Sequence, residues 1–112
     1  MNTLIRNGKV VTASETKMAD VLIEGEVIKE VRAGIAVNSA SHVIDAAGMY
    51  VLPGGIDCHT HLDMPFGGTT SADDFETGTR AAAFGGTTSI VDFAIQARGT
   101  RMRDALDTWW KK

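Results

Sequence analysis

The chain has 112 residues, of which 44% are hydrophobic and 22% charged, and its formal net charge is −3. This composition is typical of one small globular domain and excludes a disordered tail or a fibrous chain. No apolar run approaches the ~18 residues that a membrane helix needs, and a mildly acidic chain without a basic stripe binds nucleic acid poorly. The single cysteine cannot form an internal disulfide, and the N-terminus has no secretory signal pattern. We therefore expect a cytoplasmic protein that binds neither nucleic acid nor membranes.

Residues 1–52 have the pattern of an all-β layer. Short runs rich in Val, Ile and Leu alternate there with turn signals such as Asn7-Gly8. Gly25 can adopt the positive φ angle that a tight hairpin between two such runs requires. We expect strands over residues 4–11, 20–24, 27–31, 43–45 and 49–52.

From Pro53 onward the pattern changes to strands that alternate with helices. Ser71 is the expected N-cap of the first helix, and Gly85-Gly86 is its expected end. A strand, a helix and a second strand with short connections predict two parallel strands. We expect strands over residues 54–62 and 87–94, a helix over 72–84, and a last helix with an apolar stripe of Met102, Ala105, Leu106, Trp109 and Trp110. Residues 1–52 and 53–112 are therefore expected to form separate parts.

The most informative motif is Asp57-Cys58-His59-Thr60-His61. Side chains alternate on a strand, so His59 and His61 are expected to lie on one face, together with Asp57, while Cys58 faces the other side. Two imidazoles on one face can chelate a metal ion. The same spacing is also compatible with two incidental polar residues near a strand end.

Two histidines do not complete a zinc site, which needs at least three protein ligands. Asp63 could be a third ligand or an acceptor that orients a histidine ring. We expect Cys58 to be a small buried residue and His42 to have only a surface or turn role.

Three further positions have two open interpretations each. Met64 and Phe66, on a glycine-rich loop beside the histidines, could line an apolar substrate pocket or pack beneath the loop. Asp92 could be an acid behind the site or the cap of a strand end.

Several stretches of the sequence carry a family resemblance. LIRNGKVV (residues 4–11), DVLIEG (20–25) and YVLPGGIDCHTH (50–61) resemble the opening of metal-dependent cyclic amidohydrolases. The continuation, LDMPFGG (62–68) and GTRAAAFGGTT (78–88), resembles more specifically the hydantoinase and dihydropyrimidinase branch. Together these stretches cover nearly the whole chain.

The resemblance implies an α/β fold. Residues 1–52 would be a β layer, the N-terminal part of a small β-sandwich, and residues 53–112 would be the first two βα units of a (β/α)8 TIM-type barrel. The barrel would hold two zinc ions, with His59 and His61 bound to the more buried one. A carboxylated lysine, two more histidines and an aspartate of the family lie outside this segment.

The resemblance also implies a reaction. Metal-bound hydroxide would open the C–N bond of a cyclic amide, a 5,6-dihydropyrimidine of pyrimidine catabolism or a hydantoin. The loop with Asp63, Met64 and Phe66 would shape the substrate pocket. Dihydroorotases carry an arginine shortly after the second histidine, and its absence here favours a neutral ring. The resemblance also implies a homo-oligomer, because the full-length relatives are tetramers.

Two functional hypotheses follow. The chain could be a fragment of such a hydrolase, inactive by itself because most metal ligands are missing. Alternatively, it could be a self-standing small metal-binding or interaction module without catalysis.

Overall fold

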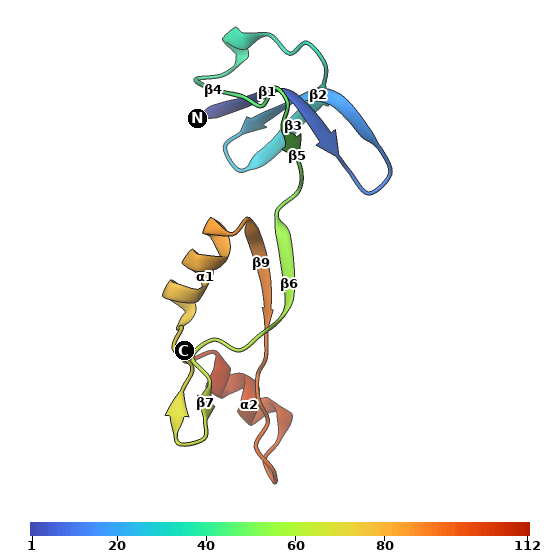
Figure 1. Ribbon diagram of the computed structural model, residues 1–112. Coiled ribbons are helices and arrows are strands. Elements are labelled where there is room, and N and C mark those ends of the chain that lie inside the picture. The colour runs from blue at the N-terminus through green and yellow to red at the C-terminus, as the bar shows by residue number, and fades with distance from the viewer. The chain divides into compact units, whose positions relative to one another are not determined.

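The computed structural model describes residues 1–112, and the chain divides into two compact units, Met1–Pro53 and Gly54–Lys112 (Figure 1). The first unit holds one five-stranded sheet, and the second holds two two-stranded sheets. Neither helix of the structure has the length and apolarity that crossing a membrane requires.

The first unit is a five-stranded mixed sheet with the order β3-β2-β1-β4, in which β5 also pairs with β1. The neighbours β1 and β2, and β2 and β3, are antiparallel, whereas β4 and β5 run parallel to β1. The strands are β1 (Asn2–Val11), β2 (Thr16–Glu24), β3 (Val27–Arg32), β4 (His42–Asp45) and β5 (Tyr50–Val51), with a short 3-10 helix η1 (Val37–Ser39) before β4. The predicted tight turn at Gly25 is confirmed, with a φ angle of 61°.

Asn7-Gly8, predicted as a turn, is instead a bulge inside β1. Asn7 has a φ angle of 61°, and the register with β2 shifts between Ile5 and Gly8. The turn prediction was wrong because a bulge uses the same left-handed conformation that Asn adopts in turns. The bulge leaves the backbone N–H of Asn7 without a partner strand, and this N–H donates to Asp20 Oδ1 at 2.9 Å.

Two small apolar clusters form the core of this unit. Leu4 pairs with Leu22 and the next residue, Ile5, pairs with Val21, so the two clusters lie on opposite faces of the sheet. The buried members are Leu4, Leu22 and Ile35 in one cluster and Val10, Ala19 and Val21 in the other.

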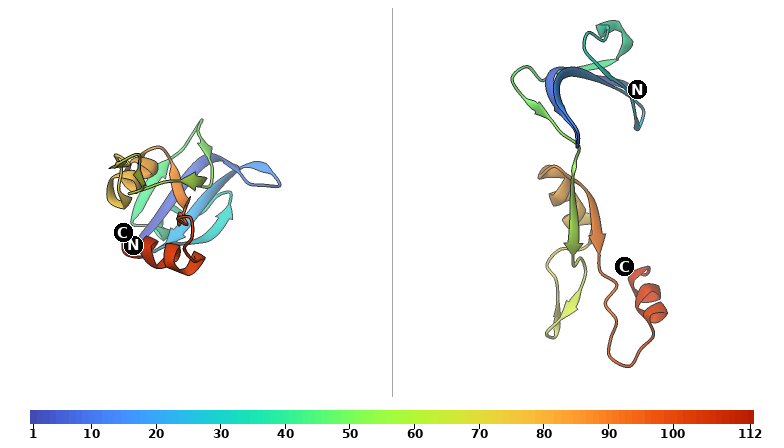
Figure 2. Two further views of the ribbon diagram at one scale, coloured as in Figure 1. Left: turned by 90° about the horizontal axis from the view of Figure 1, so that it is seen from below. Right: turned by 90° about the vertical axis from the view of Figure 1, so that its right-hand side faces the viewer.

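The second unit is built on two parallel strands, β6 (Gly55–Thr60) and β9 (Thr87–Asp92), which confirms the predicted parallel pairing. Helix α1 (Phe75–Phe84) connects them and packs against β9 (Figure 2). A two-stranded hairpin of β7 (Pro65–Phe66) and β8 (Thr69–Thr70) follows β6, and helix α2 (Met102–Trp109) follows β9.

Helix α1 begins three residues later than predicted. Its N-cap is Asp74, which accepts a hydrogen bond from the Thr77 backbone N–H at 2.8 Å, and Thr77 Oγ1 accepts from the Asp74 N–H in return. Ser71 does not cap the helix, because its hydroxyl accepts the Met64 backbone N–H and donates to the Asp73 carbonyl. The helix ends at Gly85, as predicted.

The second unit has almost no buried core, since Ala105 is its only fully buried residue. Cys58, predicted to be buried, is exposed, and so is Trp110, predicted to lie on a core-facing stripe. Both predictions assumed that a neighbouring layer covers the apolar faces, and no such layer is present among these residues.

Candidate functional site

The two histidines meet at the carboxyl end of β6. His59 is the penultimate residue of the strand and His61 follows its last residue. Their Nε2 atoms lie 3.1 Å apart, and the rings are inclined at 72°. The strand therefore brings both side chains to one side, as the alternation predicts.

This geometry fits a shared metal ion. Zinc–nitrogen bonds of about 2.0–2.1 Å at a tetrahedral angle hold two imidazole nitrogens about 3.3 Å apart. The observed 3.1 Å between the Nε2 atoms is close to that value, and without a metal it is also the distance of a hydrogen bond between the two rings. Nδ1 of His61 is buried without a hydrogen-bond partner in the chain, so it is free to donate to an acceptor behind the site, as metal-ligating histidines do.

The Phe93 ring packs beside both imidazoles. Its ring centroid is 4.5 Å from that of His59 and 5.1 Å from that of His61. It follows β9 directly, at the same sheet edge as the histidines. The Phe93 ring therefore provides an apolar surface next to both imidazoles.

The neighbouring acidic residues do not join the histidines. Asp57 accepts the backbone N–H of His59 at 3.1 Å, so its carboxylate supports the main chain of the strand. Asp63 lies beyond the strand with a φ angle of 47°, and its N–H donates to the Asp73 carbonyl. No group of three His, Cys, Asp or Glu side chains is placed to hold a metal ion. Asp63 therefore does not join the two histidines in this structure, where the chain turns at this residue with a positive φ angle.

Asp92, at the end of β9, lies directly behind the histidine segment. Its Oδ1 accepts the Thr60 hydroxyl at 3.0 Å and the Leu62 N–H at 2.9 Å, and its Oδ2 accepts the Trp109 indole N–H at 2.7 Å. Burial raises the pKa of this carboxyl, but the hydrogen bonds from Leu62, Trp109 and Thr60 outweigh burial and leave the pKa below its usual value. Of the two interpretations left open by the sequence, the acid behind the site is the one that these contacts favour.

Lys112 also reaches this region. Its ammonium group donates to the Leu62 carbonyl at 3.0 Å, and its charge contributes to lowering the pKa of Asp92. The last residue of the described chain thus contacts the segment just after His61.

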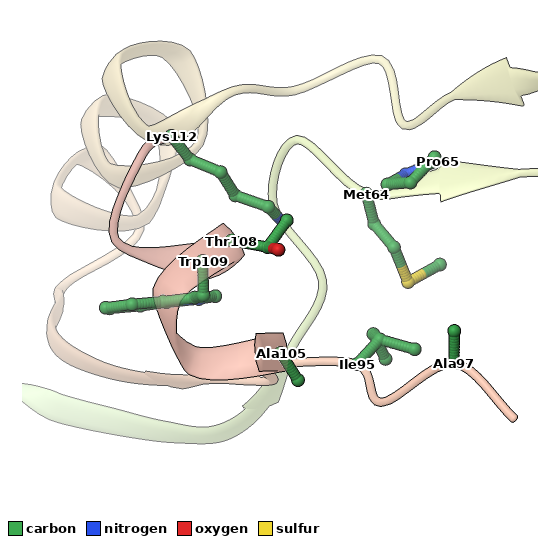
Figure 3. Close-up of a pocket in the computed structure, with 8 residues that line it drawn as sticks. All are labelled: Met64, Pro65, Ile95, Ala97, Ala105, Thr108, Trp109 and Lys112. Atoms are coloured by element: carbon green, nitrogen blue, oxygen red, sulfur yellow. The ribbon is translucent and has the colours of Figure 1, made fainter. Parts of the chain in front are cut away.

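The loop after the histidines has two different faces. Met64 and Pro65 line a pocket of about 280 Å³ against α2 and residues 95–97 (Figure 3). Phe66 is 75% exposed and precedes Gly67-Gly68, whose positive φ angles form the hairpin turn. Phe66 therefore does not pack beneath the loop, and neither histidine lines the pocket in Figure 3.

Sequence reasoning missed Thr60 and Phe93. Thr60 faces away from the histidines on β6, yet it is paired in register with Asp92 on β9. The available signal was that carboxyl ends of adjacent parallel strands share one sheet edge. Residues at the end of the predicted second strand were therefore candidates to contact the His-x-His segment.

Comparison with known proteins identifies relatives of this chain. The model of the amidohydrolase family matches residues 50–110. The chain is 58% identical to a D-hydantoinase of Streptomyces coelicolor, covering 98% of this chain and 24% of that protein. It is 46% identical to the dihydropyrimidinase of Rattus norvegicus, covering 95% of this chain and 21% of the relative.

Solved structures agree with these matches. The dihydropyrimidinase of Brevibacillus agri superposes with a TM-score of 0.89 at 58% identity, over 99% of this chain and 24% of the other. A D-hydantoinase from Thermus sp. superposes with a TM-score of 0.88 at 37% identity, over 98% of this chain and 24% of the other. The chain thus spans about a quarter of the length of the relatives it matches.

Proposed function

Because this chain belongs to the amidohydrolase family, we propose that the whole protein opens the C–N bond of a cyclic amide, a hydantoin or a 5,6-dihydropyrimidine. The observation that carries the proposal is the convergence of His59 and His61, with Nε2 atoms 3.1 Å apart at the carboxyl end of a parallel strand. The similarity to D-hydantoinases and dihydropyrimidinases supports the substrate class.

The proposed fold of the whole protein is a small β-sandwich and a (β/α)8 barrel. Residues 1–52 would contribute to the sandwich and residues 53–112 would begin the barrel. Two features support this assignment: β6 and β9 are parallel with α1 between them, and apolar side chains of this unit such as Ile56, Phe84 and Val91 are more than half exposed. Further barrel strands and helices would cover them.

His59 and His61 would hold zinc through their Nε2 atoms. The remaining ligands, among them a carboxylated lysine, would come from residues outside this segment, because the chain itself offers no group of three ligands. Bound zinc supplies Lewis-acid activation of water and of the amide carbonyl. The chain's own residues would orient the pair: Asp57 accepts the backbone N–H of His59, and the Phe93 ring packs beside both imidazoles.

The loop that contains Asp63, Met64 and Phe66 would shape the substrate pocket. Residues 62–70 carry no basic side chain, so this part of the wall offers no counter-ion for an anionic substrate. The exposed ring of Phe66 is available to contact an apolar ring substituent. A neutral cyclic amide fits these properties best. We further propose that the whole protein is a cytoplasmic homo-oligomer, in line with the sequence expectation.

The first test uses the whole protein with His59→Ala or His61→Ala. Each variant should lose bound zinc, measured by elemental analysis, and kcat/KM for dihydrouracil and hydantoin should fall by roughly a thousandfold, because several kcal/mol of transition-state stabilisation are lost. His42→Ala is the matched control, since His42 is exposed on β4, and it should keep both zinc and activity. Full zinc content and turnover in His59→Ala would contradict the proposal.

The second test uses the 112-residue chain alone. We expect no ring opening, because the chain provides two histidines and no third ligand near them. Product formation from dihydrouracil, abolished in a His59→Ala/His61→Ala double variant, would contradict this. Calorimetric zinc titration separates the alternatives: tight 1:1 binding by the isolated chain would instead support a self-standing metal-binding module.

A further inference from the structure

Few main-chain hydrogen bonds hold the end of β6, where the histidines lie. The strand ends at Thr60, and the chain then turns through Asp63, which has a φ angle of 47°. The main-chain hydrogen bond that continues the pairing with β9 runs from the Phe93 N–H to the Thr60 carbonyl, at 3.3 Å. Beyond Thr60, side-chain hydrogen bonds replace those between the strands.

The carboxylate of Asp92 accepts these hydrogen bonds. Its Oδ1 accepts from the Thr60 hydroxyl and from the Leu62 backbone N–H, at 3.0 and 2.9 Å. Thr60 and Leu62 are the two immediate neighbours of His61. One oxygen atom thus binds the side-chain hydroxyl of the residue before His61 and the backbone N–H of the residue after it.

The carboxylate is itself held in place. Its Oδ2 accepts the Trp109 indole N–H at 2.7 Å, and the Trp109 ring stands edge-on to Phe75, with centroids 5.6 Å apart. Because each oxygen has its own donors, the carboxylate cannot rotate without losing hydrogen bonds. Helices α1 and α2 are thereby linked, through Trp109 and Asp92, to the Thr60 hydroxyl and the Leu62 backbone N–H on either side of His61.

We propose that Asp92 is a positioning residue that sets the direction of the His61 imidazole toward the metal ion. This proposal rests on the proposed function, since it assigns His61 a metal. A merely structural Asp92 would stabilise the unit without affecting the ligand geometry. Loss of a residue that hydrogen-bonds a ligating side chain weakens metal binding by about 10–100-fold. Asp92 bonds the two neighbours of His61 and not its ring, so the lower end of this range is expected.

Three substitutions separate the contacts. Asp92→Ala removes all of them. Asp92→Asn can keep an accepting Oδ1 for Thr60 and Leu62, but it sets an amide N–H₂ against the indole N–H of Trp109. Thr60→Val has nearly the shape of threonine and removes the hydroxyl donor alone. Asp107→Ala is the control, because Asp107 pairs only with Arg103 on exposed α2 surface.

The experiment measures the whole protein loaded with Co²⁺ in place of zinc. Asp92→Ala should weaken metal binding, measured by chelator competition, by about tenfold, and should change the visible absorption of bound Co²⁺. Asp92→Asn and Thr60→Val should give smaller changes in the same direction, and kcat should fall more than KM changes. Asp107→Ala should match the wild type in all these measurements.

Wild-type metal affinity and Co²⁺ absorption in both Asp92→Ala and Thr60→Val, with a lower melting temperature alone, would overturn the proposal. If Asp92→Ala does not fold, Asp92→Asn and Thr60→Val carry the same test. The two proposals fail differently. A wild-type protein that binds no metal overturns both, whereas loss of metal in His59→Ala with unchanged Asp92 variants overturns only the assignment of Asp92.

Discussion

Asp20 is a buried charged residue with 4% of its surface exposed. Its two carboxylate oxygens accept different backbone N–H groups, Oδ1 that of Asn7 and Oδ2 that of Ile35, both at 2.9 Å. Burial raises the pKa of this carboxyl, but the hydrogen bonds from Asn7 and Ile35 outweigh it, and the pKa lies below the ordinary value of 3.8. Asp20 is therefore ionised at neutral pH. It accepts the Asn7 N–H that the bulge leaves without a partner in the sheet.

Asp20→Asn should destabilise the chain at neutral pH by about 1–3 kcal/mol, because one of the two backbone N–H groups then faces an amide N–H₂. The folded-state pKa of Asp20 is depressed, so its contribution to stability is present above the unfolded pKa of about 3.9 and is lost as pH falls through the folded pKa. The difference in unfolding free energy between wild type and variant should therefore shrink below about pH 4.

Urea unfolding of β-sheet circular dichroism at several pH values measures this difference. Asp107→Asn, on the exposed surface of α2, is the control and should change stability little. A gap between wild type and Asp20→Asn that stays constant down to the lowest accessible pH would contradict the role assigned to the ionised carboxylate.

At the scale of elements, the pairing of β6 with β9 depends on a glycine just before β6. A Cβ atom at Gly54 would lie 2.1 Å from Thr88 Oγ1 and 2.7 Å from Thr88 Cβ. Such distances are incompatible with van der Waals contact, and Thr88 is β-branched, so it cannot yield by a simple rotation. Glycine at this position allows the two strands to approach at the start of the sheet.

Gly54→Ala should therefore destabilise the second unit, by about 1–3 kcal/mol, and should reduce hydrogen-exchange protection of the β6 and β9 amides while leaving β1–β3 unchanged. Gly85→Ala is the matched control. Its added Cβ would have its nearest contact at 3.4 Å, and its φ of −82° suits alanine. Equal protection of β6 and β9 in Gly54→Ala and wild type would show that the strands do not pair this closely.

At the scale of the whole molecule, the two units differ in how well they cover their apolar side chains. The first unit has two buried clusters, whereas in the second unit only Ala105 is fully buried. Strands β6 and β9 form a two-stranded sheet, so each has one edge without a partner. Unpaired edges and exposed apolar faces favour association with other chains.

We therefore predict that the isolated 112-residue chain associates in solution. Analytical ultracentrifugation should detect oligomers or aggregates, and the chain should bind a hydrophobic dye such as ANS. Co-expression with the remainder of the proposed whole protein should suppress both effects, because the proposed barrel elements would cover the same surfaces. A monomer with a single sharp, two-state unfolding transition would count against this prediction.

Much of the local structure follows from the sequence by itself, because strands and turns depend on neighbouring residues. The pairing across Gly25, the parallel strands on either side of α1 and the end of that helix at Gly85 were all predicted correctly. The His-x-His spacing placed two imidazoles together because side-chain alternation is a property of a single strand. The family resemblance was confirmed, for example by a D-hydantoinase that is 58% identical over 98% of this chain.

Only the tertiary structure decided which groups act as partners of these residues. Whether Ser71 or Asp74 caps α1 depended on the competing hydrogen bond between Ser71 and Met64. Asp92 was ambiguous in sequence because its donors, Thr60 and Trp109, come from residues 32 positions before it and 17 after it. Alternation and turn propensity act over a few residues, whereas a hydrogen-bond partner is chosen by proximity in the folded chain.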